Sequence, residues 1–166
     1  ILYRLADDRY LVVANASNAD VVAAALTERA ATFDATVTDR SAGYALIAVQ
    51  GPRSLDVLRD VVDVELEPVK YYAWYGGTAA GVPALLARTG YTGEDGFELF
   101  VPSEQAPQVW QSVLKAGAEH GLVPCGLACR DTLRLEAGMP LYGQELTRDV
   151  TPYDAGLGRV VRLDKD

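Results

Sequence analysis

Hydrophobic and polar residues alternate over several short stretches of this chain, and a period of two is typical of β-strands. Clusters of Gly, Pro, Asp and Ser separate these stretches and indicate turns. The expected strands cover residues 9–14, 35–40, 44–51, 71–77, 82–89 and 97–102. The fourth and fifth are expected to form a hairpin that turns around Gly76–Gly77 and Gly81.

Two longer segments carry apolar residues at helical spacing, and each begins at a serine that can cap a helix. The stripe after Ser17 consists of Val21, Val22, Ala25 and Leu26. The stripe after Ser103 consists of Val109, Trp110, Val113 and Leu114. Two further helices are expected over residues 53–62 and 128–138, the last of them ended by Gly138.

The two serine-capped helices each follow a strand, so the same strand, cap and helix layout occurs twice. Two such units interleaved with antiparallel strands predict an α+β fold, with helices on a ferredoxin-like antiparallel sheet. A chain of 166 residues is long enough to bury a core of one domain or of two small ones.

The charge and the cysteines exclude some classes of partner. A net charge of −8 argues against a broad phosphate-binding face, so nucleic acid is not expected as a partner. No apolar run approaches the roughly 20 residues that span a bilayer, so no membrane is expected either. Cys125 and Cys129 could hold half a metal site with His120, but no fourth ligand is evident. We therefore interpret both thiols as core residues and predict no metal.

The glycine-rich stretch RTGYTGEDGFELF at residues 88–100 lacks the lysine of a phosphate loop and the acid spacing of a calcium loop. It precedes a strand, not a helix, which also excludes a dinucleotide loop. If Phe97 and Leu99 face the core, Glu98 projects to the other side, near Tyr91. A carboxylate beside an aromatic ring suits a planar ligand with N–H donors, such as a pterin. The alternative is a tight turn without a ligand.

A second cluster of charges lies in the helix expected over residues 128–138. Arg130 and Arg134 share a helix face, and Arg134 can pair with Asp131, three residues earlier. Arg130 lies near the helix start, where the helix dipole disfavours a cation. That position indicates an anion or a buried carboxylate as its partner, whereas solvated surface charge is the alternative.

Two stretches carry a resemblance to a known family: RTGYTGEDGFELF at residues 88–100 and CGLACRDTLRLEAGMPLYGQELTRDVTPYDAGLGRVV at residues 125–161. Together they closely resemble the aminomethyltransferase (T-protein) family of the glycine cleavage system. YLVVANASN and ALIAVQGPRS are similar to the same family and occur in the same order. The resemblance covers essentially the whole chain, and the two motifs are highly specific in combination.

This resemblance implies a tetrahydrofolate-dependent reaction. An aminomethyl group on the lipoyl arm of the H-protein is attacked by tetrahydrofolate, which yields ammonia, 5,10-methylene-tetrahydrofolate and the reduced arm. It also implies a folate-binding disc of three domains, of which residues 1–166 would form the central portion. The alanine-, valine- and arginine-rich composition favours a bacterial cytoplasm over a mitochondrial matrix as its location.

The resemblance also assigns roles to individual residues. Glu98 matches the pterin-binding glutamate of the family, and Arg130 matches its ligand-site arginine. Tyr91 matches the tyrosine of the glycine loop that lines the pocket. Asn15 and Tyr3 match further pocket positions.

The family's catalytic aspartate would lie just upstream of Ile1, and its C-terminal barrel domain would follow residue 166. Asp7–Asp8 is no substitute, because it falls in a turn between strands. No catalytic residue is therefore assigned within the chain, and the chain alone is expected to be inactive. Two alternatives stay open: the folate domain of a dimethylglycine or sarcosine dehydrogenase-like protein, and a non-catalytic folate-binding module. Against the first, those domains resemble Gly-Glu-Leu-Gly-Trp more than the Gly-Glu-Asp-Gly-Phe found here.

Overall fold

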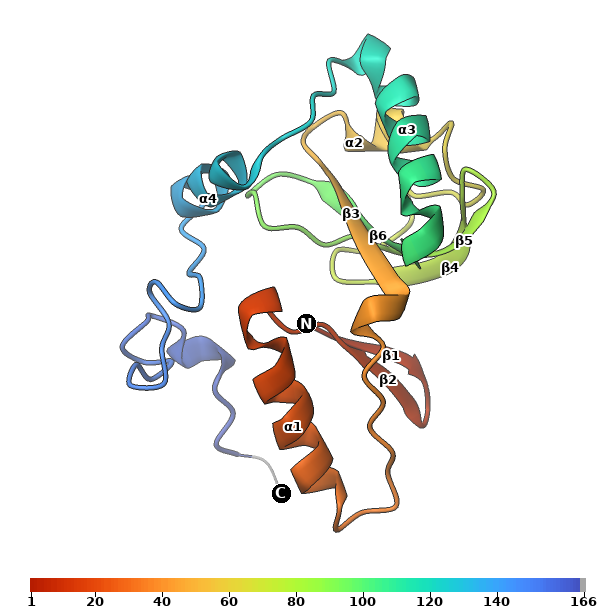
Figure 1. Cartoon of the computed structure of the whole chain (residues 1–166). Coiled ribbons are helices and arrows are strands. Elements are labelled where there is room, and N and C mark those ends of the chain that lie inside the picture. Colours follow the sequence, from red (N-terminus) through yellow and green to blue (C-terminus); the bar gives the residue numbers. More distant parts are fainter. Residues whose placement is uncertain (165–166) are drawn as a thin grey trace.

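A four-stranded antiparallel sheet is the larger of two sheets in the structure, a computed structural model that describes residues 1–164 (Figure 1). Its strands are β3 (Tyr44–Gln50), β4 (Trp74–Ala79), β5 (Val82–Ala87) and β6 (Gly96–Pro102). They lie in the order β3-β6-β5-β4, and every neighbouring pair is antiparallel. The predicted strands over residues 44–51, 71–77, 82–89 and 97–102 are confirmed, with small shifts at their ends.

The main core lies between this sheet and two helices, α2 (Ser54–Leu58) and α3 (Ala106–Gly117). Alternation along β6 places Phe97, Leu99 and Val101 in this core with no exposed surface. Val109 and Val113 of α3 are buried with them, as their helical spacing predicts. Each fully buried apolar side chain of this size contributes about 1.5–3 kcal/mol relative to an exposed one. Trp110 is 39% exposed, so its predicted place in the apolar stripe is wrong.

A separate hairpin covers part of the opposite face of the sheet. It consists of β1 (Leu2–Ala6) and β2 (Arg9–Val12), which pair antiparallel around the expected turn at Asp7–Asp8. Tyr3 of β1 packs edge-on against Phe100 of β6, with ring centroids 5.8 Å apart. Tyr3, Phe100 and Ala87 form a second, smaller core, so β6 is covered on both faces.

The α+β class and the antiparallel sheet are confirmed, whereas the ferredoxin-like arrangement is wrong. Around the four-stranded sheet the elements run β-α-β-β-β-α, and the ferredoxin-like motif runs β-α-β-β-α-β. The reason is that β4, β5 and β6 follow one another as antiparallel neighbours with no helix between them. In addition, β2 pairs with β1 in its own sheet, so the first strand-and-helix unit never joins the second.

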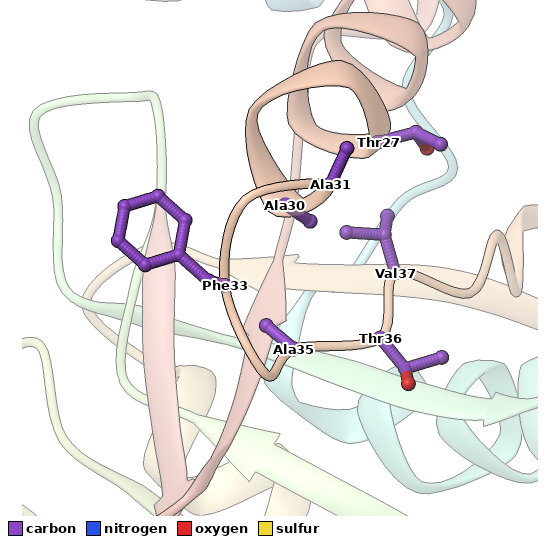
Figure 2. Close-up of a pocket in the computed structure, with 7 residues that line it drawn as sticks. All are labelled: Thr27, Ala30, Ala31, Phe33, Ala35, Thr36 and Val37. Atoms are coloured by element: carbon purple, nitrogen blue, oxygen red, sulfur yellow. The ribbon is translucent and has the colours of Figure 1, made fainter.

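The segment from residue 19 to residue 43 differs most from expectation. The helix α1 (Ala19–Ala30) is confirmed, but it buries none of its residues completely. No strand forms over residues 35–40, because the described residues offer them no partner strand for a hydrogen-bond ladder. Instead the chain turns after α1 around a hollow of about 430 Å³, and Figure 2 shows Phe33 pointing away from the other lining side chains.

Neither predicted serine cap is formed. Ser17 lies inside a 3₁₀ turn (Ala16–Asn18), and Asn18 is the residue that precedes α1. Ser103 begins another 3₁₀ turn (Ser103–Gln105), and its hydroxyl donates to the carbonyl of Ala42 at 2.7 Å. In both cases the 3₁₀ turn moves the start of the α-helix beyond the reach of the serine.

The hairpin between β4 and β5 turns at Ala80–Gly81, not at Gly76–Gly77. Both turn residues have positive φ, 52° and 77°, as the favoured two-residue hairpin turns require. Gly76 and Gly77 instead lie inside β4, opposite Leu85 and Ala84. The helix expected over residues 53–62 is also shorter than predicted and ends at Leu58.

The fourth helix, α4 (Leu127–Glu136), confirms the helix expected over residues 128–138. Figure 1 shows it beside the loop that joins β5 to β6. Among the described residues, no helix has both the length and the apolar character that crossing a bilayer requires.

Position 96 in β6 has no space for a side chain larger than that of glycine. An added Cβ would lie 2.7 Å from the backbone oxygen of Val49 and 2.5 Å from the Gln50 side chain. We expect Gly96→Ala to lower the free energy of unfolding by about 1–3 kcal/mol, because the backbone of β3 has no room to yield. Gly76→Ala is the matched control, since a Cβ there meets nothing within 4 Å. Urea denaturation compares the two, and equal midpoints would contradict the expectation.

Candidate ligand-binding site

Glu98 lies on the face of β6 opposite the main core, as the alternation with Phe97 and Leu99 predicts. Its neighbours across the sheet are Ala48 on β3 and Ala87 on β5. Ala87 is completely buried in the second core, whereas Ala48 is exposed, so the free space beside Glu98 lies on the β3 side. Glu98 is half-buried, so its carboxylate can meet a ligand while staying attached to a rigid strand.

The carboxylate of Glu98 is held by a chain of hydroxyl groups. The Thr89 hydroxyl donates to Glu98 Oε2, and the Tyr3 hydroxyl lies 3.0 Å from Thr89 Oγ1. Tyr3 and Thr89 are only 2% and 1% exposed. Burial is the main cause that raises the pKa of Tyr3; the Thr89 hydrogen bond lowers this pKa, and the charge of Glu98 raises it.

The loop between β5 and β6 is closed by an ion pair at its two ends. Arg88 donates from Nε to Asp95 Oδ1 at 2.9 Å and from Nη2 to Asp95 Oδ2 at 2.7 Å. This two-point hydrogen bond lowers the pKa of Asp95 below its usual value. The backbone carbonyl of Asp95 also accepts from the N–H of Gly51 at 2.8 Å. Asp95 therefore holds the loop in shape and is not free to bind a ligand.

The middle of the loop packs against the end of α4. Gly93 has a φ of +80°, a conformation that favours glycine, and a Cβ there would lie 2.8 Å from Cβ of Ala137. The conformational freedom of this glycine therefore lets the loop contact α4 directly. The sequence interpretation, in which the glycines lie against a flat ligand, stays a prediction.

Tyr91 and Arg130 form a second pair, which joins the loop to α4. The Tyr91 hydroxyl donates to the carbonyl of Pro140, and the guanidinium of Arg130 lies 5.0 Å from the centre of the Tyr91 ring. Such a cation–π contact contributes about 0.5–1 kcal/mol at an exposed site. Burial is the main cause that raises the pKa of Tyr91, and nearby Arg134 and Arg130 oppose the rise. Arg130 itself is exposed, so its other donors face solvent.

Arg134 has a structural role next to this pair. Its buried guanidinium lies 2.7 Å from Asp131, which confirms the predicted pairing, and 2.6 Å from Glu145. It also donates to the carbonyl of Met139 at 3.1 Å. These contacts hold the segment that follows α4 in place, including the carbonyl of Pro140 to which Tyr91 donates.

The two cysteines are not core residues, which corrects the sequence interpretation. Both Cys125 and Cys129 are exposed, because the first turn of α4 and the segment before it lie on the surface of the described chain. Within residues 1–164, no group of three or more His, Cys, Asp and Glu side chains is placed to hold a metal ion.

The whole of the described chain matches one protein family. The family model described as the GCVT N-terminal domain matches residues 1–165. The chain belongs to this family.

Among the curated relatives of this chain is the aminomethyltransferase of Streptomyces avermitilis, which is 65% identical over all 166 residues. The aminomethyltransferase of Streptomyces coelicolor is 64% identical over the same length. In both cases the chain spans 45% of the relative, a little under half of its length.

Solved structures agree with this assignment. The crystal structure of glycine cleavage system aminomethyltransferase T from Bartonella henselae is 36% identical, with a TM-score of 0.85. The match covers 98% of this chain and 42% of that one. The heterotetrameric sarcosine oxidase from Corynebacterium sp. U-96 is 20% identical over 70% of this chain, with a TM-score of 0.55, and so shares the fold alone.

The site residues expected from the family resemblance do not form one cluster in the structure. They fall into separate groups. Glu98 is linked to Tyr3 through Thr89, and Tyr91 contacts Arg130. Among the described residues, no hydrogen bond or ring contact joins Tyr91 to Glu98. Asn15 is exposed just before the 3₁₀ turn, where its carbonyl accepts from the N–H of Asn18 at 2.9 Å.

Three residues of the site were missed by sequence reasoning. Arg88 and Asp95 stand at opposite ends of the glycine stretch, and this pairing of opposite charges was a usable signal. Thr89 had no such signal, because a threonine beside a glycine loop is ordinary turn composition. Only the pairing of β5 with β6 places its hydroxyl against Glu98.

Proposed function

We propose that this chain is the folate-binding core of an aminomethyltransferase of the glycine cleavage system, the central portion of a three-domain disc. The observation that carries the proposal is the half-buried Glu98 carboxylate, held by Thr89 beside the exposed Ala48 of β3. Relatives that are 61–65% identical over nearly all of the chain bear the name aminomethyltransferase, which supports it.

The reaction moves a one-carbon unit from sulfur to nitrogen. The carbon–sulfur bond to the lipoyl arm of the H-protein breaks, and bonds to two nitrogens of tetrahydrofolate form. Ammonia leaves, 5,10-methylene-tetrahydrofolate results, and the arm returns to its dithiol. Tetrahydrofolate is thus a co-substrate, the lipoylated H-protein is the partner, and a bacterial cytoplasm is the location.

The residues of this chain would bind and orient the folate. Glu98 accepts hydrogen bonds from N–H groups of the pterin, and a negatively charged acceptor makes these bonds stronger than neutral ones. Tyr91 lines the pocket, and the exposed donors of Arg130 face the ligand or its anionic part. Tyr3 and Asn15 lie at the pocket's border. No residue of this chain is assigned the acid or base role.

A sarcosine oxidase-like folate domain is the second candidate, because the Corynebacterium enzyme shares the fold. Its 20% identity, against 36% for the Bartonella aminomethyltransferase, favours the first proposal. A folate-binding module without catalytic activity is the third candidate for the isolated chain.

The test uses an assay with lipoylated H-protein and tetrahydrofolate. The full-length protein that contains this chain is expected to release ammonia and form methylene-tetrahydrofolate. The 166-residue chain alone is expected to show no turnover, because no acid or base residue is assigned to it. Absence of turnover by the full-length protein would overturn the proposed function. Turnover by the chain alone would instead show that a catalytic residue lies within it.

A further inference from the structure

Along the chain from Tyr3 through Thr89 to Glu98 Oε2, only one direction of donation gives both hydroxyl hydrogens an acceptor. Tyr3 and Thr89 are both buried, and each hydroxyl has one hydrogen to donate. When Tyr3 donates to Thr89 and Thr89 donates to Glu98 Oε2, both hydrogens have an acceptor. In the reverse direction, a protonated Glu98 would donate to Thr89 and Thr89 to Tyr3. The Tyr3 hydrogen would then have no acceptor among the described residues, which is costly for a buried donor.

This direction of hydrogen bonding determines which Glu98 oxygen can accept a hydrogen bond from a ligand. Its Oε2 accepts from Thr89, so this oxygen acts as an acceptor and the carboxyl group is held in one orientation. Its Oε1 accepts no hydrogen bond from the described residues, and the neighbouring Ala48 on β3 is exposed. The group that meets Glu98 must therefore bring hydrogen-bond donors.

The backbone of Thr89 is held by the Gln50 side chain. Gln50 Nε2 donates to the Thr89 carbonyl at 3.1 Å and to the Phe97 carbonyl at 3.0 Å. These two bonds tie the start of the glycine loop to β6, one residue from Glu98. The Gln50 side chain thus fixes the backbone of Thr89 without any ligand.

We propose that Thr89 is a positioning residue for folate binding, which holds Glu98 Oε2 and so orients the carboxyl group toward the hydrogen-bond donors of the pterin. The inference rests on the proposed function, because it names how the same site recognises its substrate. Thr89 acts through Glu98 and is not expected to touch the ligand.

The experiment measures the Kd of tetrahydrofolate by calorimetry in the full-length protein. Thr89→Val removes the hydroxyl at nearly constant volume and is expected to raise the Kd about fivefold to tenfold, because a Glu98 side chain that is no longer held must lose its rotamer freedom on binding. Thr89→Ser keeps the hydroxyl and is expected to remain within about threefold of wild type. Thr92→Val is the matched control, because Thr92 lies in the same loop and, among the described residues, its hydroxyl oxygen makes one hydrogen bond, from the N–H of Glu94 at 3.4 Å.

A double-mutant cycle separates positioning from a general loss of structure. In a Glu98→Gln background, adding Thr89→Val is expected to change the Kd by less than about twofold, because the orienting bond has lost its charged acceptor. If Thr89→Val does not fold, the double variant Tyr3→Phe/Thr89→Val leaves no buried hydroxyl unpaired and is expected to show the same loss of binding.

The outcomes distinguish this inference from the proposed function. If wild type binds and Glu98→Gln does not, while Thr89→Val binds like wild type, the role of Thr89 is refuted and the site stands. The role is also refuted if Thr89→Val weakens binding equally with and without Glu98. If wild type does not bind tetrahydrofolate, the proposed function fails, and the inference fails with it.

Discussion

Glu98→Gln is expected to weaken tetrahydrofolate binding by about 100-fold, the largest effect of any single substitution in the site. The variant keeps the shape of the side chain but removes its charge and replaces one acceptor oxygen with a donor. Hydrogen bonds to charged groups contribute about 1.5–3 kcal/mol each, and an unpaired donor on the ligand adds a penalty. Two affected bonds therefore account for a loss of this size. Calorimetric titration of the full-length protein provides the measurement.

Glu94→Gln is the matched control for this prediction. Glu94 lies in the same loop, carries the same charge and is exposed. The variant is expected to bind tetrahydrofolate like wild type, which would exclude a general effect of the net charge of −8. Equal affinities of Glu98→Gln and wild type would show that the pterin binds elsewhere.

Phe97→Ala is expected to lower the free energy of unfolding by about 3–5 kcal/mol, the usual effect of removing a buried aromatic ring. Phe97 has no exposed surface and packs in the main core under α2 and α3. Its ring also lies 5.4 Å from the guanidinium of Arg88, so the ring supports the base of the glycine loop as well. Since domains are stable by about 5–15 kcal/mol, the loss is a large share of the total.

Urea denaturation followed by circular dichroism measures this effect on the 166-residue chain. Phe33→Ala is the control, because Phe33 is 74% exposed and its removal leaves no cavity. Its unfolding free energy is expected to stay within about 0.5 kcal/mol of wild type. A similar loss in both variants would mean that β6 is not the centre of the core.

Several features of the fold could be predicted because they depend on neighbours in the sequence. The alternation around Phe97 and Leu99 decides which face of β6 Glu98 occupies, whatever lies on either side of the sheet. The spacing of Val109 and Val113 identifies the buried face of α3 in the same way. Predictions failed where a tertiary contact competed with a local preference. Serine is a common helix cap, but the Ser103 hydroxyl donates to the carbonyl of Ala42 instead.

The sequence by itself determined the α+β class, most strands of the main sheet, the side of Glu98 and the family to which the chain belongs. Only the tertiary structure decided the strand order, the absence of a strand over residues 35–40 and the neighbours of Glu98. Tyr3 and Thr89 are separated by 86 residues and have no sequence signal in common. The physical reason is that periodicity encodes which face a side chain occupies, whereas its partners depend on which distant strands pair and pack.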